Sequence, residues 1–267
     1  VFRHLFFDFP HGNQAMRLTR PLLAILLGLS LVPVTAAAKG AKSFTATAVQ
    51  TAPNTQSQSG KIFVSDTGTR FEFSEYGRDV VQITLTDKKL MRVLFPADKF
   101  YIETTTPKET PITAAKSTTP CPSTPAMVCR KLGNEKFGTM DVERWSQSIT
   151  GLKGEATLWW DPKRKMIVRQ EYPDGRVMQM QLSNKDAYNG RDTERWDISY
   201  VQQGRTMARA VRLIDVELGI IVKEQSPSGM IRELRDLKAV NASPEWFTVP
   251  DGYQKIEPPK PETLQKQ

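Results

Sequence analysis

Residues 161 to 180 read DPKRKMIVRQEYPDGRVMQM, and residues 215 to 234 read DVELGIIVKEQSPSGMIREL. Aligned without a gap, the two stretches match at Asp161 and Asp215, Ile167 and Ile221, Val168 and Val222, Pro173 and Pro227, and Gly175 and Gly229. Proline fixes φ, and glycine tolerates the positive φ that a tight reversal needs. Each stretch therefore predicts two β-strands joined by a Pro-x-Gly turn.

The repeat extends upstream, where GTMDVERW (138 to 145) corresponds to GRDTERW (190 to 196) once a three-residue insertion is allowed. Side chains alternate between the two faces of a strand. Trp145 therefore shares a face with Glu143, and Arg144 lies on the opposite face. This separation excludes a catalytic Glu-Arg pair within the strand. The repeat predicts two consecutive meanders of one sheet, with Trp145 and Trp196 directed at the same concave face.

The first half of the chain also alternates between apolar and polar residues in short segments. We expect one strand at 43 to 50, a hairpin over 61 to 75 and three more strands within 79 to 103. A Thr/Pro-rich segment follows, and we expect a long loop over 104 to 135 because such a composition buries little apolar surface. Loops of this length act as lids in some proteins and are solvated excursions in others.

The N-terminal part of the sequence is typical of a signal for export. Arg17 and Arg20 precede an apolar run from Leu22 to Val34, and small residues follow at 36 to 38. We expect residues 1 to 38 to be a signal peptide, with 1 to 15 an over-extended start. No cysteine lies near the cut, so we expect the exported protein not to be lipidated, to be periplasmic and soluble, and to have no transmembrane segment in its mature form. A single domain over 39 to 256 and a polar tail over 257 to 267 would remain.

Residue types limit the chemistry that this domain can perform. His4 and His11 are the only histidines and lie within the predicted signal peptide, which excludes His-dependent nucleophilic catalysis and His metal ligation afterwards. We expect no cofactor, no metal site and no enzymatic activity. The formal charge of +8 comes from interspersed residues of both signs, so we do not expect nucleic acid as a partner.

Cys121 and Cys129 are the only cysteines in the chain. Two thiols without histidine cannot complete a structural zinc site. In an oxidising compartment they favour a disulfide, and the alternative is a redox-active pair, although the spacing is not that of a Cys-x-x-Cys motif.

The predicted fold class is mainly β. Many strands and few helical segments leave the sheet to curl and enclose its own apolar face. A wide, incomplete barrel of this kind leaves a cavity, and we expect a ligand to bind there.

A closing phrase, SPEWFTVPDGYQKI (243 to 256), follows the repeat. Taken with the export signal, the successive hairpins and the Glu-Arg-Trp strands, this phrase resembles the LolA/LolB-like periplasmic superfamily, particularly members that end in Phe-x-Val-Pro-x-Gly-Tyr. In this chain the phrase comprises Phe247, Val249, Pro250, Gly252 and Tyr253. The resemblance implies a strongly curved antiparallel sheet that forms an unclosed half-barrel with short capping helices and loops. It also implies an apolar interior that binds acyl chains of lipids or lipoproteins. For the phrase itself we favour a structural role: Ser243 and Pro244 begin a helical turn, Phe247 and Val249 fill the core, and Gly252 turns the chain.

The candidate site is the apolar face of the sheet. Its candidate lining residues are Phe71, Phe73, Trp145, Met178, Met180, Trp196 and Met207. Methionine suits both a packed core and a pocket for acyl chains, so both interpretations stay open. The predicted function is a periplasmic carrier of a hydrophobic ligand, and the alternative is a module that binds an envelope protein for regulation or assembly.

Overall fold

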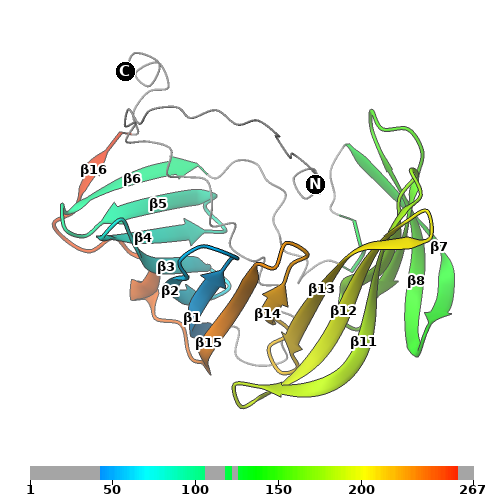
Figure 1. Cartoon of the computed structure of the whole chain (residues 1–267). Helices are drawn as coiled ribbons and strands as arrows, with labels where there is room; N and C mark the ends of the chain where they lie inside the picture. Colours follow the sequence, from blue (N-terminus) through cyan, green and yellow to red (C-terminus); the bar gives the residue numbers. More distant parts are fainter. Residues whose placement is uncertain (1–42, 106–117, 122–125, 258–267) are drawn as a thin grey trace, which may run out of the picture. The chain divides into compact units, whose positions relative to one another are not determined.

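The computed structural model describes residues 43–105, 118–121 and 126–257 (Figure 1). The predicted signal peptide and residues 258–267 of the predicted tail lie outside this part of the chain. Among the described residues, no helix has the length and apolar character required to cross a membrane.

Six strands form the N-terminal half of the sheet. They are β1 (Phe44–Thr51), β2 (Gln58–Val64), β3 (Gly68–Glu75), β4 (Arg78–Leu85), β5 (Leu90–Phe95) and β6 (Phe100–Thr105). Their bounds confirm the strand predicted at 43 to 50, the hairpin over 61 to 75 and the three strands within 79 to 103.

The rest of the described chain supplies ten strands and one short 3-10 helix, η2 (Pro244–Phe247). The strands are β7 (Met127–Phe137), β8 (Met140–Ile149), β9 (Ala156–Asp161), β10 (Met166–Glu171), β11 (Arg176–Tyr188), β12 (Arg191–Gln202), β13 (Arg205–Asp215), β14 (Ile221–Gln225), β15 (Ile231–Ala239) and β16 (Gln254–Ile256).

All sixteen described strands belong to one curved sheet (Figure 1). Its order is β16-β6-β5-β4-β3-β2-β1-β15-β14-β13-β12-β11-β10-β9-β8-β7. The two halves of the chain join where β1 pairs with β15, for example Phe44 with Ala239. Every pairing is antiparallel except that of β16 with β6. Because β7 and β16 end the order without pairing with each other, the described sheet is not closed, and the predicted curved, unclosed mainly β fold is confirmed.

The predicted repeat is present as two meanders, β8 to β11 and β12 to β15. In each, the second and third strands pair around one extra residue, Val168 in β10 and Val222 in β14. Both extra residues are buried. The Pro-x-Gly turns also match, with φ of 79° at Gly175 and 82° at Gly229. The repeated sequence therefore specifies the same bulged hairpin twice.

The loop predicted over 104 to 135 is wrong at its C-terminal end. Strand β7 begins at Met127, inside that range, and pairs with β8 from Met127 opposite Ile149 to Phe137 opposite Met140. An edge strand pairs on one side only and keeps many side chains in solvent, so its polar composition hides it from a hydrophobic pattern. Residues 106–117 and 122–125 of the predicted loop lie outside the described chain.

Three clusters of buried side chains form the core. The first joins β1, β2 and β3 to the β13–β14 hairpin and includes Phe44, Phe71 and Ile220. The second spans β8 to β13 and includes Met180 and Trp196. The third is built from β4 and β5. The core is thus distributed along the sheet instead of being gathered in one interior.

The closing phrase completes the third cluster. Ser243 is the N-cap of η2 and its side chain accepts a hydrogen bond from the Glu245 N–H, with Pro244 at the start of the helix. Phe247 is buried among the side chains of β4 and β5, and Val249 packs against them. The structural role predicted for this phrase is therefore confirmed.

Candidate functional site

A row of side chains crosses six strands on one face of the sheet. It is fixed by successive register pairs, each residue lying opposite the next on the neighbouring strand. Its members are Trp145, Leu158, Gln170, Met178, Tyr200 and Ala208. We call this set the cross-strand row. Five of its six side chains are apolar or aromatic, so it offers an elongated surface suited to an apolar molecule.

Exposure along the cross-strand row is graded. Leu158 is buried completely and Gln170 almost so, whereas Trp145, Met178 and Tyr200 are half-buried. Helix η2, the one helix of the described chain, contacts β3 and β4, which do not contribute to the row. Three large side chains of the row therefore keep part of their surface open to contact.

The row has the length required for an acyl chain. Neighbouring strands lie about 4.8 Å apart, so six strands span about 24 Å. The hydrocarbon core of a bilayer is about 30 Å thick and holds two acyl chains end to end, or about 15 Å for each. A single chain laid across the strands would thus span about four of the six strands and contact the side chains there that keep exposed surface.

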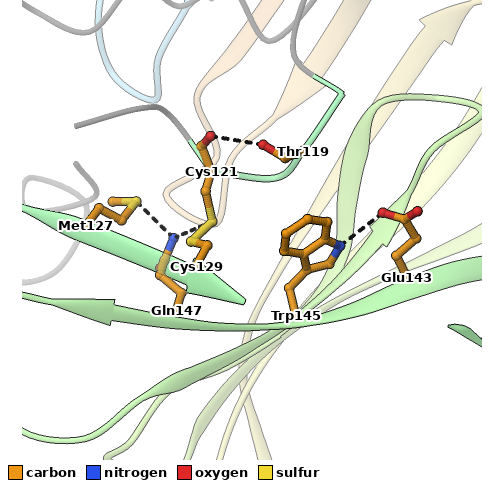
Figure 2. Close-up of a disulfide and its surroundings, with 7 residues drawn as sticks. All are labelled: Thr119, Cys121, Met127, Cys129, Glu143, Trp145 and Gln147. Atoms are coloured by element: carbon orange, nitrogen blue, oxygen red, sulfur yellow. Dashed lines mark hydrogen bonds between the residues drawn. A yellow bond between two sulfur atoms is a disulfide. The ribbon is translucent and has the colours of Figure 1, made fainter. Parts of the chain in front are cut away.

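The disulfide lies beside the Trp145 end of the row (Figure 2). Cys121 and Cys129 are bonded, with Cα atoms 6.4 Å apart, which confirms the predicted pairing. The Gln147 Nε2 group donates to Cys121 Sγ at 3.8 Å and to Met127 Sδ at 3.3 Å. The indole N–H of Trp145 donates to Glu143 Oε2 at 3.0 Å. The disulfide thus anchors residues 118–121 against β7 and β8 on the side where Trp145 lies.

The predicted lining residues do not form one site. Phe71 and Phe73 stack at a ring distance of 5.0 Å within the first core cluster. Met180 and Trp196 are buried in the second cluster, and Met178 packs against it. These buried side chains build the core, while Trp145 and Met178 contribute to the cross-strand row.

Met207 is not where the sequence placed it. Alternation along residues 207 to 213 predicts that Met207 shares an apolar face with Val211 and Leu213, but its side chain is 65% exposed. Tyr200 pairs with Ala208 and Val201 with Thr206, so Met207 is the extra residue of a β-bulge. A bulge changes the alternation of side chains between the faces, and a period-two pattern cannot locate it.

Successive register pairs place Trp145 and Trp196 on the same face of the sheet. Trp145 belongs to the cross-strand row, and Trp196 lies four residues before Tyr200 on the same strand and face. Leu158, Gln170, Tyr200 and Ala208 complete the row, although none was among the predicted lining residues. Alternation along the strand predicts Tyr200 on the Trp196 face, but the sequence holds no signal for the register that joins it to Trp145.

The repeated aspartates cap the turns of the two bulged hairpins. Asp161 Oδ1 accepts the backbone N–H groups of Lys163 and Arg164 at 2.8 and 3.1 Å. Asp215 Oδ1 accepts the N–H of Leu218 at 2.7 Å. Both carboxylates are buried and each pairs with an arginine, Arg164 for Asp161 and Arg191 for Asp215. The conserved geometry of the two copies is therefore that of a turn cap.

Arg164 connects one of these turns to the neighbouring meander. Its Nε and Nη2 groups bind both oxygens of Glu194 at 2.8 Å. The guanidinium carbon lies 5.4 Å from the ring centre of Trp196. Hydrogen bonds from Arg164 lower the pKa of Glu194 below its ordinary value of 4.5. A carboxylate held ionised in this way is a structural anchor and a poor proton donor.

A separate hollow of about 420 Å³ lies at the end of the β11–β12 hairpin. Its walls are Asn189, Arg235, Asp236, Leu237 and Lys238. Four of these five residues are polar or charged. The hollow is therefore unsuited to an acyl chain, and the candidate site remains the cross-strand row.

Tyr188, next to this hollow, makes the stability of the fold sensitive to alkaline pH. Burial, then the hydrogen bond from its hydroxyl to Glu233, raises its pKa from 10.0 to about 12. A raised folded pKa contributes stability that is complete below pH 10 and is lost as the pH rises through about 12. We expect Tyr188→Phe to flatten this alkaline loss, as measured by urea unfolding at pH values from 8 to 12.

The other tyrosines supply the control for this experiment. Burial also raises the pKa values of Tyr172 and Tyr200, so some alkaline loss will remain in the variant. An identical pH profile for Tyr188→Phe and the wild type would contradict the assignment to Tyr188.

Comparisons with known proteins were made for the whole chain. No protein-family model matches it, and no curated protein does. Among solved structures, a LolA superfamily protein from Nitrosomonas europaea is 12% identical, with 79% of this chain and 92% of that chain covered and a TM-score of 0.36. A putative outer membrane lipoprotein-sorting protein domain from Vibrio parahaemolyticus is 14% identical, with 79% and 91% covered and a TM-score of 0.34.

MucB is a further similar structure, at 11% identity and a TM-score of 0.33, with 83% of this chain and 62% of that chain covered. The matched structures thus include a protein of the superfamily that the sequence resembles. Likenesses at these identities and TM-scores assign no ligand and no partner to this chain.

Proposed function

We propose that this protein is a periplasmic carrier that binds an acyl chain of a lipid or lipoprotein along the cross-strand row. The observation that carries the proposal is the row itself, in which half-buried Trp145, Met178 and Tyr200 line one face of an unclosed sheet. Binding would remove their remaining apolar surface from water, which contributes roughly 25 cal/mol per Å². A large apolar ligand therefore gains most at this face.

The proposal includes binding without catalysis. Within the described residues, no three His, Cys, Asp or Glu side chains are grouped as a metal site would require. The lowered pKa of Glu194 results from its structural ion pair with Arg164. The histidine-free sequence after residue 38 supports the same view. A carrier would act through the shape and apolar character of its surface.

The test is titration of the purified protein with a dansyl-labelled fatty acid, followed by fluorescence. We expect saturable binding, and we expect Trp145→Glu and Met178→Glu each to weaken it about tenfold or more, because a carboxylate replaces apolar contact surface. Met207→Glu is the matched control, since Met207 is 65% exposed and outside the row. Circular dichroism spectra verify that each variant is folded.

Two outcomes would count against the carrier. One is an absence of binding by the wild type, together with no lipid in native mass spectra of gently purified protein. The other is an equal effect of all three variants, which would show that the probe does not use the row. A protein-binding module, the alternative function, would instead retain an envelope partner when it is free of lipid.

A further inference from the structure

The outer edge of β7 is open among the described residues. At the opposite end of the sheet, β16 adds to β6 in parallel and covers part of that edge. No strand within 43–105, 118–121 or 126–257 pairs with β7 on the side away from β8 (Figure 1). An open edge presents unpaired N–H and C=O groups that can accept another strand. The fold therefore contains an unused position for strand addition.

Two exposed side chains at this edge lie on one face. Val128 and Arg130 lie opposite Ser148 and Ser146 of β8, and Leu132 is the extra residue of the bulge that follows. Val128 is 64% exposed, Leu132 is 40% exposed, and Arg130 is exposed as well. The small serines beside Val128 and Arg130 leave both side chains uncovered. The edge thus offers an apolar and a basic side chain on one face, before the bulge.

Charge identifies what this edge fits. Both lysines of β7 already have acidic partners: Lys131 pairs with Glu143, and Lys136 pairs with Asp141 at 2.6 Å. Arg130 takes part in no ion pair with any residue of the described chain. A strand that carries an acidic residue and, two positions away, an apolar residue would pair with Arg130 and cover Val128. Such a segment matches the edge in both charge and apolar contact.

The features that usually prevent strand addition at a sheet edge do not block all of β7. A bulge at Leu132 interrupts the regular pairing, and edge lysines normally repel another strand. Both lysines pair with acidic residues of β8, and residues 127–131 precede the bulge in regular register. Five residues are close to the mean strand length in proteins. The disulfide at Cys129 further restrains this segment.

We propose that the edge of β7 binds an extended acidic segment of a partner protein by strand addition, with an Asp or Glu of the partner paired with Arg130 and an apolar residue two positions away in contact with Val128. This site lies outside the cross-strand row and does not depend on the carrier function. The partner supplies main-chain hydrogen bonds for affinity and its acidic residue for specificity.

The test uses a dye-labelled peptide of alternating sequence, Thr-Val-Thr-Glu-Thr-Val-Thr, and a counterpart with Lys in place of Glu. At low salt we expect the full-length protein to bind the Glu peptide about fivefold more tightly than the Lys peptide, as measured by fluorescence anisotropy. Arg130→Glu should reverse this preference. Arg209→Glu is the matched control, because Arg209 is likewise exposed but lies on β13, away from the β7 edge, and pairs with Ser199 of β12.

Amide hydrogen exchange locates the binding. We expect the outward-facing amides of residues 127–131 to exchange quickly in the free protein and to be protected by the Glu peptide. The proposal is overturned if neither peptide binds, or if Arg130→Glu leaves the preference unchanged. Protection of these amides before peptide is added would also overturn it, since another part of the chain would already cover the edge.

Discussion

Trp196→Ala is expected to lower the free energy of unfolding by about 3–5 kcal/mol, the range for truncating a buried tryptophan. The Trp196 side chain is 0% exposed and packs in the second core cluster with Met180, Ile198 and Ala210. Alanine would leave a cavity among them and would remove the ring beneath Arg164. Urea unfolding followed by circular dichroism measures the change.

Trp145→Ala provides the comparison within the repeat. Trp145 occupies the matching position but is half-buried, so we expect less than half of the loss that Trp196→Ala causes. Met207→Ala should change the free energy of unfolding by no more than about 0.5 kcal/mol, as for other exposed sites. Equal losses for Trp145→Ala and Trp196→Ala would contradict the packing described for the second cluster.

Asp161→Ala and Asp215→Ala are each expected to lower the free energy of unfolding by about 3 kcal/mol. Either change removes the acceptor of turn N–H groups and leaves a partly buried arginine with one acidic partner instead of two. Because the two aspartates cap equivalent turns in the two meanders, the two substitutions should have similar effects. Urea unfolding at neutral pH measures both.

Asp174→Ala is the matched control for these two variants. Asp174 also lies in a turn, and it accepts the N–H of Arg176, but its side chain is 52% exposed. Water can replace its interactions, so we expect a loss of less than about 1 kcal/mol. If Asp174→Ala were as damaging as Asp161→Ala, burial would not be the reason that the repeated aspartates matter.

Much of the local structure could be predicted from the sequence. Alternating apolar residues located the hairpins of β2 to β6, and the Pro-x-Gly turns located the ends of β10 and β14. The candidate site was predictable only in part. Trp145 and Met178 were identified, but Leu158, Gln170, Tyr200 and Ala208 join them through the register of six strands. Register depends on pairing between segments, and a single sequence does not record it.

The sequence by itself determined most of the strands, the repeated hairpin and the turn at which each copy reverses. These features follow from neighbouring residues, because φ preferences, side-chain alternation and the Asp caps act over a few positions. Only the tertiary structure decided that β1 pairs with β15, that Met207 leaves its face at a bulge and that β7 forms an open edge among the described residues. Those outcomes depend on contacts between residues far apart in the chain, where packing of the whole sheet overrides local pattern.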